Sequence, residues 1–314
     1  MFSYRHAFHA GSHADVLKHM ALVAVVNHLT QKDTPLTVVD THAGAGLYRL
    51  DGDYAATSGE AIDGIGKLFA AFPLAAAVAG SGAACAPLLK DYLALVAGFN
   101  RSGTLKIYPG SPFVVQALLR QEARDKLKLF ELHPTDSKAL AGHIAQLEAK
   151  RQVVMARQDG FEGLKALLPP PKSATGSQRA LVLIDPSYEI KSDYPRVADC
   201  VADSLRRFAT GTYMVWYPVI PRPEAHDLPR RLKTLATQAG KSWLQATLHI
   251  GQRPGMQEVV MPGEQQRRGG MTASGIFLIN PPHTLKAQLQ AALPDVLKLL
   301  GRGTGQAWAV EAGG

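Results

Sequence analysis

Leu36-Thr37-Val38-Val39-Asp40 is a short apolar run that leads directly into the turn Thr41-His42-Ala43-Gly44-Ala45-Gly46. The run is typical of a buried strand, and the glycines behind it predict a tight turn. In an open parallel sheet, ligands bind beyond the carboxyl ends of the strands, where glycines let the backbone approach them closely. This stretch therefore predicts the first strand of an α/β sheet with a ligand site at its end.

Six more strand candidates follow along the chain and alternate with helices. The strand candidates cover residues 127–131, 152–157, 180–185, 212–217, 243–249 and 275–280, and the helical patterns cover residues 137–149, 162–168, 194–208, 223–238 and 284–300. An apolar helix precedes the first strand, with Ser12 and Asp15 as its capping box and an end near Leu29. The alternation predicts an α/β fold with a mostly parallel, seven-stranded sheet and helices on both faces.

Three segments do not follow this alternation. Residues 51–103 have a helical, Ala-rich pattern without a clear strand, and Pro and Gly interrupt their uncharged stretch 68–89, which favours two short helices over a membrane span. Residues 251–270 are rich in Gly, Arg and Gln and are expected to form a mobile basic loop, whereas the tail from Gly301 is poorly patterned. The whole chain, 1–314, is expected to form a single domain.

The composition is that of a soluble globular protein with a basic charge. Of the 314 residues, 46% are hydrophobic, and 34 Lys and Arg outnumber 26 Asp and Glu, for a formal net charge of +8. This charge favours an anionic partner, with nucleic acid first. The two cysteines, Cys85 and Cys200, exclude a disulfide framework and a Cys-rich zinc site. The polar start of the chain lacks a signal-peptide pattern, which predicts a cytoplasmic protein with no membrane partner.

The glycine turn indicates the kind of cofactor. Asp40-x-x-x-Gly44-x-Gly46 differs from the G-x-G-x-x-G pattern of dinucleotide sites. It suits S-adenosylmethionine, which has a carboxylate, an amine and a ribose but no pyrophosphate, and whose approach Gly44 and Gly46 would permit. Taken alone, the motif leaves a purely structural turn open as an explanation.

Two further strand ends carry acidic residues that suit the same cofactor. Glu131 closes the second strand candidate, and its carboxylate could accept hydrogen bonds from both hydroxyls of a ribose. Asp159 and Gly160 follow the third, where the carboxylate could accept from an adenine amino group. A helix cap is the alternative for Glu131, although Asp136 is the better cap candidate, and an ordinary turn is the alternative for Asp159.

The fourth strand candidate delivers the tetrapeptide Asp185-Pro186-Ser187-Tyr188. Methyltransferases that act on planar exocyclic nitrogens carry Asp, Asn or Ser here, then Pro-Pro and an aromatic residue. Hydrogen bonds from the amino group to the Asp185 carboxylate and the Pro186 carbonyl would draw its nitrogen toward sp³ geometry, and they strengthen as positive charge develops there. Tyr188 would stack on the base, and the chemistry requires no metal.

A second candidate tetrapeptide, Asn280-Pro281-Pro282-His283, follows the last strand candidate. We interpret it as the end of a strand, where the two prolines stop the strand from continuing, because it lies far from the cofactor strands in a doubly wound order.

The chain resembles the bacterial 23S ribosomal RNA adenine-N6 methyltransferases of the J type over nearly its whole length. The resemblance rests on these runs: Ser3-Tyr4-Arg5-His6, His9-Ala10-Gly11, residues 13–19, residues 40–46, residues 99–103, Tyr108-Pro109-Gly110-Ser111-Pro112, residues 131–134, Asp159-Gly160-Phe161, residues 207–213, Trp216-Tyr217-Pro218 and residues 270–275.

This resemblance implies a Rossmann-like class I methyltransferase with a small inserted helical subdomain, which agrees with the helical pattern of residues 51–103. It implies transfer of a methyl group from S-adenosylmethionine to an adenine N6 of 23S rRNA, either naked or in an early assembly particle, with no obligate protein partner. Carried over by position, the cofactor contacts are His19, His42, Ser111, Glu131, Asp159 and Gly160, with Asp185 at the reacting amine. Tyr4 would contact the substrate nucleotide, with His6 and Lys18 nearby.

Several alternatives remain open at this point. The histidines His6, His9, His13 and His19 could suggest a metal, but no carboxylate–histidine metal motif accompanies them, and Tyr4, His6 and Lys18 could instead form a lip for a flipped nucleotide. Ser187 departs from the proline of the family tetrapeptide and leaves Pro186 less constrained. The competing functions are methylation of DNA adenine or of a protein glutamine, and a non-catalytic RNA-binding or ribosome-assembly module.

Overall fold

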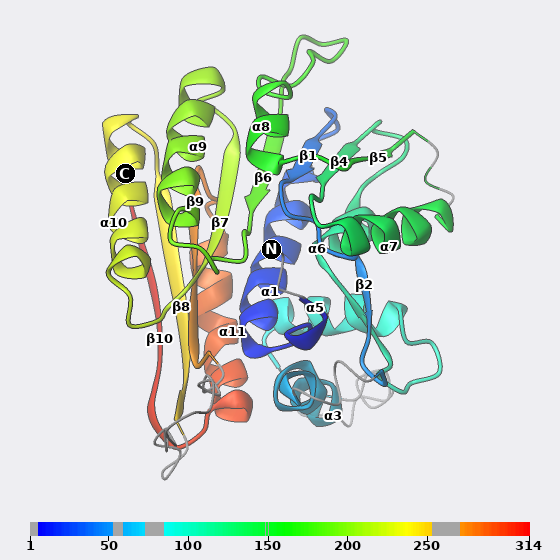
Figure 1. The fold of residues 1–314 in the computed structure, drawn as a ribbon, viewed down its shortest axis with the longest axis vertical. Helices are drawn as coiled ribbons and strands as arrows, with labels where there is room; N and C mark the ends of the chain where they lie inside the picture. The colour runs from blue at the N-terminus through cyan, green and yellow to red at the C-terminus, as the bar shows by residue number, and fades with distance from the viewer. Residues whose placement is uncertain (1–5, 53–58, 73–84, 148, 150, 253–270) are drawn as a thin grey trace.

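The computed structural model describes residues 6–52, 59–72, 85–147, 149, 151–252 and 271–314. In these residues, an eight-stranded sheet has the order β10-β8-β9-β7-β6-β1-β4-β5 (Figure 1). Its strands are β1 (Thr37–Asp40), β4 (Lys126–Phe130), β5 (Val153–Ala156), β6 (Ala180–Ile184), β7 (Thr212–Pro218), β8 (Trp243–Gln252), β9 (Ala273–Ile279) and β10 (Thr304–Gly313).

The sheet confirms the predicted α/β class and all seven predicted strands. The adjacent strands β5, β4, β1, β6 and β7 are parallel, while β9 is antiparallel to both β7 and β8. Numbered along the chain, these seven strands have the order 3-2-1-4-5-7-6. It differs from the dinucleotide-binding order by the antiparallel strand inserted beside strand 5.

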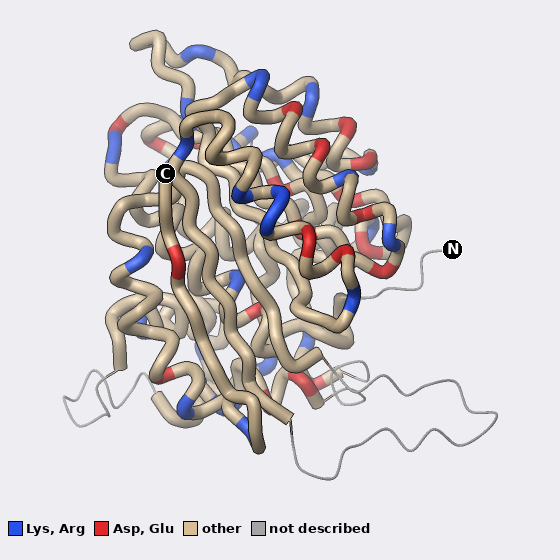
Figure 2. The backbone as a smooth tube through the Cα atoms, turned by 90° about the vertical axis from the view of Figure 1, so that its left-hand side faces the viewer, with Lys and Arg blue, Asp and Glu red and all other residues tan. Residues whose placement is uncertain are grey.

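The predicted number of strands is wrong by one. The tail that lacked a clear pattern forms β10, which pairs antiparallel with β8 from Thr304 opposite Gln252 to Gly313 opposite Trp243. β8 and β10 contain one charged side chain, that of Glu311. Figure 2, which views the molecule from this side, shows the charged residues mainly on the helices and loops around the long strands.

Helices cover both faces of the sheet. On one face lie α1 (His13–Leu29), α5 (Pro87–Gly98), α6 (Ser111–Leu118), α7 (Pro134–Ala145) and α11 (Leu285–Leu300), and on the other α8 (Gly160–Lys165), α9 (Asp193–Arg207) and α10 (Pro223–Gln238). Alternate strand residues face the two layers, because successive side chains of a strand point in opposite directions. Val38 joins the α1 layer, for example, and Val39 joins the α9 layer.

The segment between β1 and β4 is mainly helical where it is described. A two-stranded sheet of β2 (Leu47–Arg49) and β3 (Ile107–Pro109) brackets it, and it contains the π-helix η2 (Ile62–Gly66), α3 (Lys67–Ala71) and α5. These helices pack on α1 and α11, so they share the core of the sheet. Its role as a subdomain stays a prediction. No helix among the described residues is long and apolar enough to cross a membrane.

Candidate active site

A cavity of about 330 Å³ lies where β6, β1, β4 and β5 end. Because these four strands are neighbours and parallel, their ends present Asp185, the glycine turn, Glu131 and Asp159 in that order along one edge of the sheet. Adjacent strands are about 4.8 Å apart, so the row spans roughly 14 Å. The edge therefore suits an elongated ligand.

Most of the sequence-predicted site residues meet in this cavity. Its lining includes His6, Lys18, His19, His42, Gly44, Ser111, Glu131, Asp159, Gly160, Asp185 and Pro186. Gly46 and Tyr188 do not line it, and Tyr4 lies outside the described residues.

The glycine turn is tied to the second strand end by Glu131. The Gly44 amide donates to Glu131 Oε2 at 2.7 Å, and the His133 amide donates to Oε1 at 2.7 Å. Burial raises the pKa of Glu131, although these two hydrogen bonds oppose the shift. Gly46 has a packing role, because its φ is +84° and a Cβ there would meet Phe113 and Leu140.

The third strand end is both a helix cap and a charged site. Asp159 caps α8 by accepting from the Phe161 amide at 2.9 Å, and its Oδ2 accepts from Arg196 at 2.6 Å. The Arg196 guanidinium lies 4.5 Å from the centre of the Phe161 ring. Burial would raise the pKa of Asp159, but its hydrogen bond with Arg196 holds the pKa below the ordinary value. The expected cap at Asp136 is wrong: the side chain of His133 caps α7.

Asp185 is held by a buried lysine of α1, a contact that sequence reasoning missed. Lys18 Nζ lies 2.6 Å from Asp185 Oδ2 and 2.9 Å from Asp15 Oδ1. Asp15 in turn accepts from the Gly11 amide at 2.9 Å and pairs with His6 at 3.0 Å. The predicted capping box is therefore wrong in its contacts, because Ser12 occupies the cap position without a side-chain hydrogen bond.

This charge cluster is stabilised by its own ion pairs. Burial alone would lower the pKa of Lys18, but the carboxylates of Asp15 and Asp185 raise it above the ordinary value. Burial would likewise raise the pKa of Asp15, and the neighbouring His6 and Lys18 hold it well below its usual range. With 4% of its surface exposed, Lys18 is part of the cavity wall and not of an outer lip. The available signal was a Lys three residues after an Asp in a mainly apolar helix.

Other buried polar side chains at the cavity are neutral or shifted toward the neutral form. Burial lowers the pKa of His42 to about 4 and that of His19 to about 3. Burial raises the pKa of Asp40 to about 6, although its carboxylate accepts from Ser111 Oγ at 2.6 Å. A neutral imidazole has one nitrogen that donates a hydrogen bond and one that accepts, so these rings are suited to bind a polar ligand.

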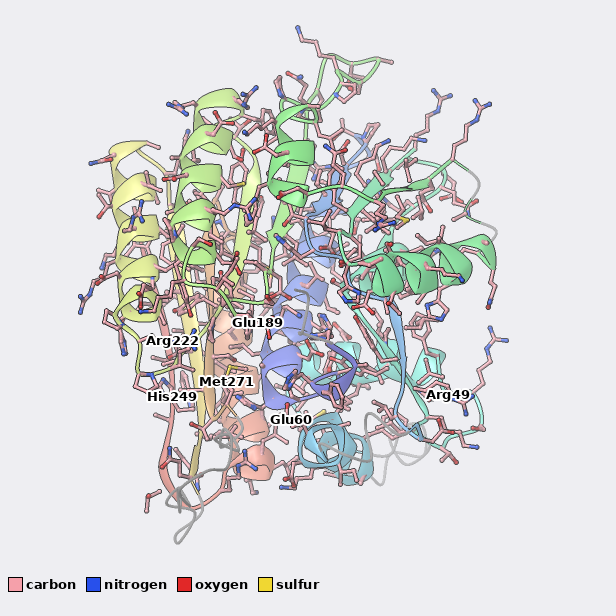
Figure 3. All side chains as sticks on the ribbon, in the orientation of Figure 1. Arg49, Glu60, Glu189, Arg222, His249 and Met271 are labelled. Carbon is pink, nitrogen blue, oxygen red and sulfur yellow. The ribbon has the colours of Figure 1, made fainter. Side chains whose placement is uncertain are left out.

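Tyr188 is not placed for the predicted stacking on a base. Its side chain is 2% exposed, its hydroxyl donates to the Trp216 carbonyl at 2.7 Å, and its φ is +53°. Arg222 Nη1 donates to the Tyr188 carbonyl at 3.4 Å. Figure 3 shows Glu189 on the loop that follows β6 and Arg222 on the segment that leads into α10. Tyr188 therefore anchors the tetrapeptide loop to the core of the sheet.

Asn280 directly follows β9, which runs antiparallel to β7, so it lies at the opposite edge of the sheet from the cavity. It donates to the Ala209 and Gly211 carbonyls, which confirms its interpretation as the end of a strand. Among the described residues, no group of three or more His, Cys, Asp or Glu side chains could hold a metal ion.

Comparison with known proteins gives the family. The family model described as Ribosomal RNA large subunit methyltransferase D, RlmJ, matches residues 33–311. The chain belongs to this family. Two relatives are named Ribosomal RNA large subunit methyltransferase J. The Escherichia coli (strain K12) protein is 41% identical over 308 residues, which are 98% of this chain and 97% of that protein. The Haemophilus influenzae protein is 38% identical over 313 residues, which are 99% of this chain and 98% of that protein.

A crystal structure of a Legionella pneumophila protein is similar in fold as well, with a TM-score of 0.77, 31% identity and coverage of 97% of this chain and 98% of that one. The RlmJ family match includes every strand end of the cavity, from β1 to β6. Lys18 and His19 precede it, and they lie within the nearly full length shared with the two relatives. The predicted Rossmann-like methyltransferase is thereby confirmed.

Proposed function

We propose that this chain transfers a methyl group from S-adenosylmethionine to the N6 amino group of an adenine in 23S rRNA. The observation that carries the proposal is the position of Asp185, whose carboxylate lines the cavity beside the glycine turn. Membership of the RlmJ family supports the rRNA substrate. Such a substrate, naked or in an assembly particle, fits the expected cytoplasmic location.

The residues of the cavity suit this cofactor. Glu131 could accept from ribose hydroxyls, and Asp159 with Arg196 forms a polar end that suits an adenine. At the other end, His19 Nε2 is buried and has no hydrogen-bond partner within the described structure. Such an atom is costly to leave unpaired, so a polar ligand group at this end is expected. When bound, the cofactor supplies an activated methyl group.

The chain's own groups act on the amine. Lys18 binds Asp185 Oδ2, which orients the carboxylate and leaves Oδ1 to accept from the adenine amino group. The Pro186 carbonyl could accept the second N–H. Both hydrogen bonds strengthen as charge develops on the nitrogen, so they favour the transition state over the ground state. A stacked base cannot reach the cavity, so the adenine is flipped out of its strand. A stacking role for Tyr188 requires its ring to leave Trp216.

The test is methyl transfer from radiolabelled cofactor to deproteinised rRNA. We expect Asp185→Ala to abolish transfer while the affinity for S-adenosylhomocysteine stays within about tenfold. Asp199→Ala is the control, because Asp199 is an exposed carboxylate of α9 outside the cavity. Normal turnover of Asp185→Ala would contradict the assignment.

The same assay with DNA and protein substrates separates the competing functions. Preference for DNA adenine or a protein glutamine would replace the rRNA proposal. Absence of cofactor binding would instead indicate a non-catalytic RNA-binding module.

A further inference from the structure

Two buried tyrosines connect the cavity to the segment between β1 and β4. His19 Nδ1 lies 2.8 Å from the Tyr108 hydroxyl, which lies 3.0 Å from the Tyr92 hydroxyl. Tyr108 belongs to β3 and Tyr92 to α5, and neither side chain is exposed. The rings of His19 and Tyr108 are stacked with their centres 5.6 Å apart. His19 is therefore held by a chain of two hydroxyls that does not itself reach the cavity.

The pKa values of His19, Tyr108 and Tyr92 determine how many protons the three hydrogen-bonded side chains carry. Burial raises the pKa of both tyrosines far above neutral pH and lowers that of His19 to about 3, so each phenol keeps its proton and the imidazole has one. If His19 Nδ1 carried that proton, Tyr108 would accept from His19 and donate to Tyr92, and the buried Tyr92 O–H would have no acceptor among its hydrogen bonds in the described structure. An unmade buried hydrogen bond is costly.

The opposite direction satisfies both phenolic donors. Tyr92 donates to Tyr108, Tyr108 donates to His19 Nδ1, and the imidazole proton is then on Nε2. Nε2 is the ring atom without a protein partner, and His19 lines the cavity. The hydrogen bonds from Tyr92 through Tyr108 to His19 thus leave the Nε2–H group of His19 as one fixed donor for a ligand.

We infer that Tyr92 and Tyr108 are positioning residues that fix His19 as an Nε2–H donor for the carboxylate of the cofactor's amino acid. The inference rests on the proposed function for the identity of the cofactor. The order of the strand ends supports the choice of group. If Glu131 and Asp159 take the ribose and adenine, the amino acid extends toward the end of the row where α1 lies, and a carboxylate accepts but cannot donate.

The first test needs no ligand. Long-range ¹H–¹⁵N spectra of the full-length protein, labelled with ¹⁵N-histidine, report which ring nitrogen carries the proton, and His19→Gln assigns the signal. We expect His19 to have its proton on Nε2. A proton on Nδ1 would overturn the inference, whatever substrate the enzyme methylates.

The second test measures binding by calorimetry. Tyr108→Phe should weaken the binding of S-adenosylhomocysteine about threefold to tenfold, which is the effect of one hydrogen bond, and Tyr92→Phe should weaken this binding less. Both substitutions should leave the affinity for 5′-methylthioadenosine unchanged, because that ligand lacks the carboxylate. In a His19→Ala background, Tyr108→Phe should have no further effect. Tyr213→Phe is the matched control: Tyr213 is equally buried, but its hydroxyl donates to the Ser204 and Phe208 carbonyls.

Equal weakening of both ligands would overturn the inference, since it would indicate a general loss of packing. The proposed function fails differently, through absence of methyl transfer to rRNA from a protein that still binds S-adenosylhomocysteine.

Discussion

Lys18 carries the positive charge that compensates the buried Asp15 and the partly buried Asp185. It pairs with Asp15 and Asp185 and is itself buried. Removing one partner from a buried ion pair leaves an uncompensated charge, which is far more costly than removing an exposed pair. The charge cluster is therefore a requirement of stability as well as of orientation at the tetrapeptide.

We expect Lys18→Met to lower the free energy of unfolding by about 3 kcal/mol. Chemical denaturation at neutral pH measures it. The control is Lys165→Met, which removes an exposed lysine paired with Glu162 and should cost less than about 1 kcal/mol. Similar small losses for both variants would show that Lys18 is not needed to compensate the two carboxylates.

His13 makes stability depend on pH. Burial lowers its pKa from 6.5 to about 4. The unfolded chain therefore takes up the proton first, so the stability due to the neutral ring is complete above pH 6.5 and is lost as the pH falls toward 4. Between pH 6.5 and 5 this loss is about 1.5 kcal/mol.

We expect His13→Gln to reduce the difference in unfolding free energy between these two pH values by that amount. Urea denaturation at each pH measures it for both proteins, and comparing differences removes any uniform effect of the substitution. An unchanged difference would mean that His13 is protonated at similar pH in the folded and unfolded chain.

At the scale of elements, α8 begins in close contact with the turn after β1. A Cβ on Gly160 would lie 1.9 Å from the Thr41 carbonyl oxygen, so α8 can begin there only with a glycine. We expect Gly160→Ala to move the start of α8, to lower the unfolding free energy by about 2 kcal/mol and to weaken S-adenosylhomocysteine.

Gly142→Ala is the matched control for this prediction. Gly142 lies within α7 with no atom within 4 Å of its Cβ position, so alanine should stabilise the protein by about 0.5 to 1 kcal/mol. Thermal and chemical unfolding together with calorimetry measure both variants. Equal stability of the two would contradict the close packing at Gly160.

The sequence predicted the strands of the sheet and their ends, but not the contacts between distant segments. Strands such as Leu181–Ile184 were found because buried parallel strands are continuous apolar runs, and their ends located Glu131, Asp159 and Asp185. The contact of Lys18 with Asp185 spans 167 positions, and no local pattern encodes such a pair. The link from His19 to Tyr108 was missed for the same reason, and β3 is only three residues long.

On the scale of the whole molecule, β10 completes one edge of the sheet. It was missed because Gly303, Gly305 and Gly313 interrupt its pattern and most of its side chains are exposed. Trp308 and Val310 nevertheless pack against the main core, and β10 pairs with β8 along its whole length. β8 itself carries no charged residue, so without β10 it would be a long, uncharged edge.

Deletion of residues 303–314 should therefore lower the unfolding free energy by about 3 kcal/mol, since it exposes partly buried apolar surface and the backbone of β8. It should also produce dimers or larger species, because an uncharged edge strand pairs with other chains. Thermal unfolding and size-exclusion chromatography with light scattering measure the two effects. Ala309→Thr is the control, because Ala309 is exposed between Trp308 and Val310, and threonine is favourable in strands. A truncated chain with the same stability and the same oligomeric state as the full-length protein would show that the seven predicted strands form a complete fold without β10.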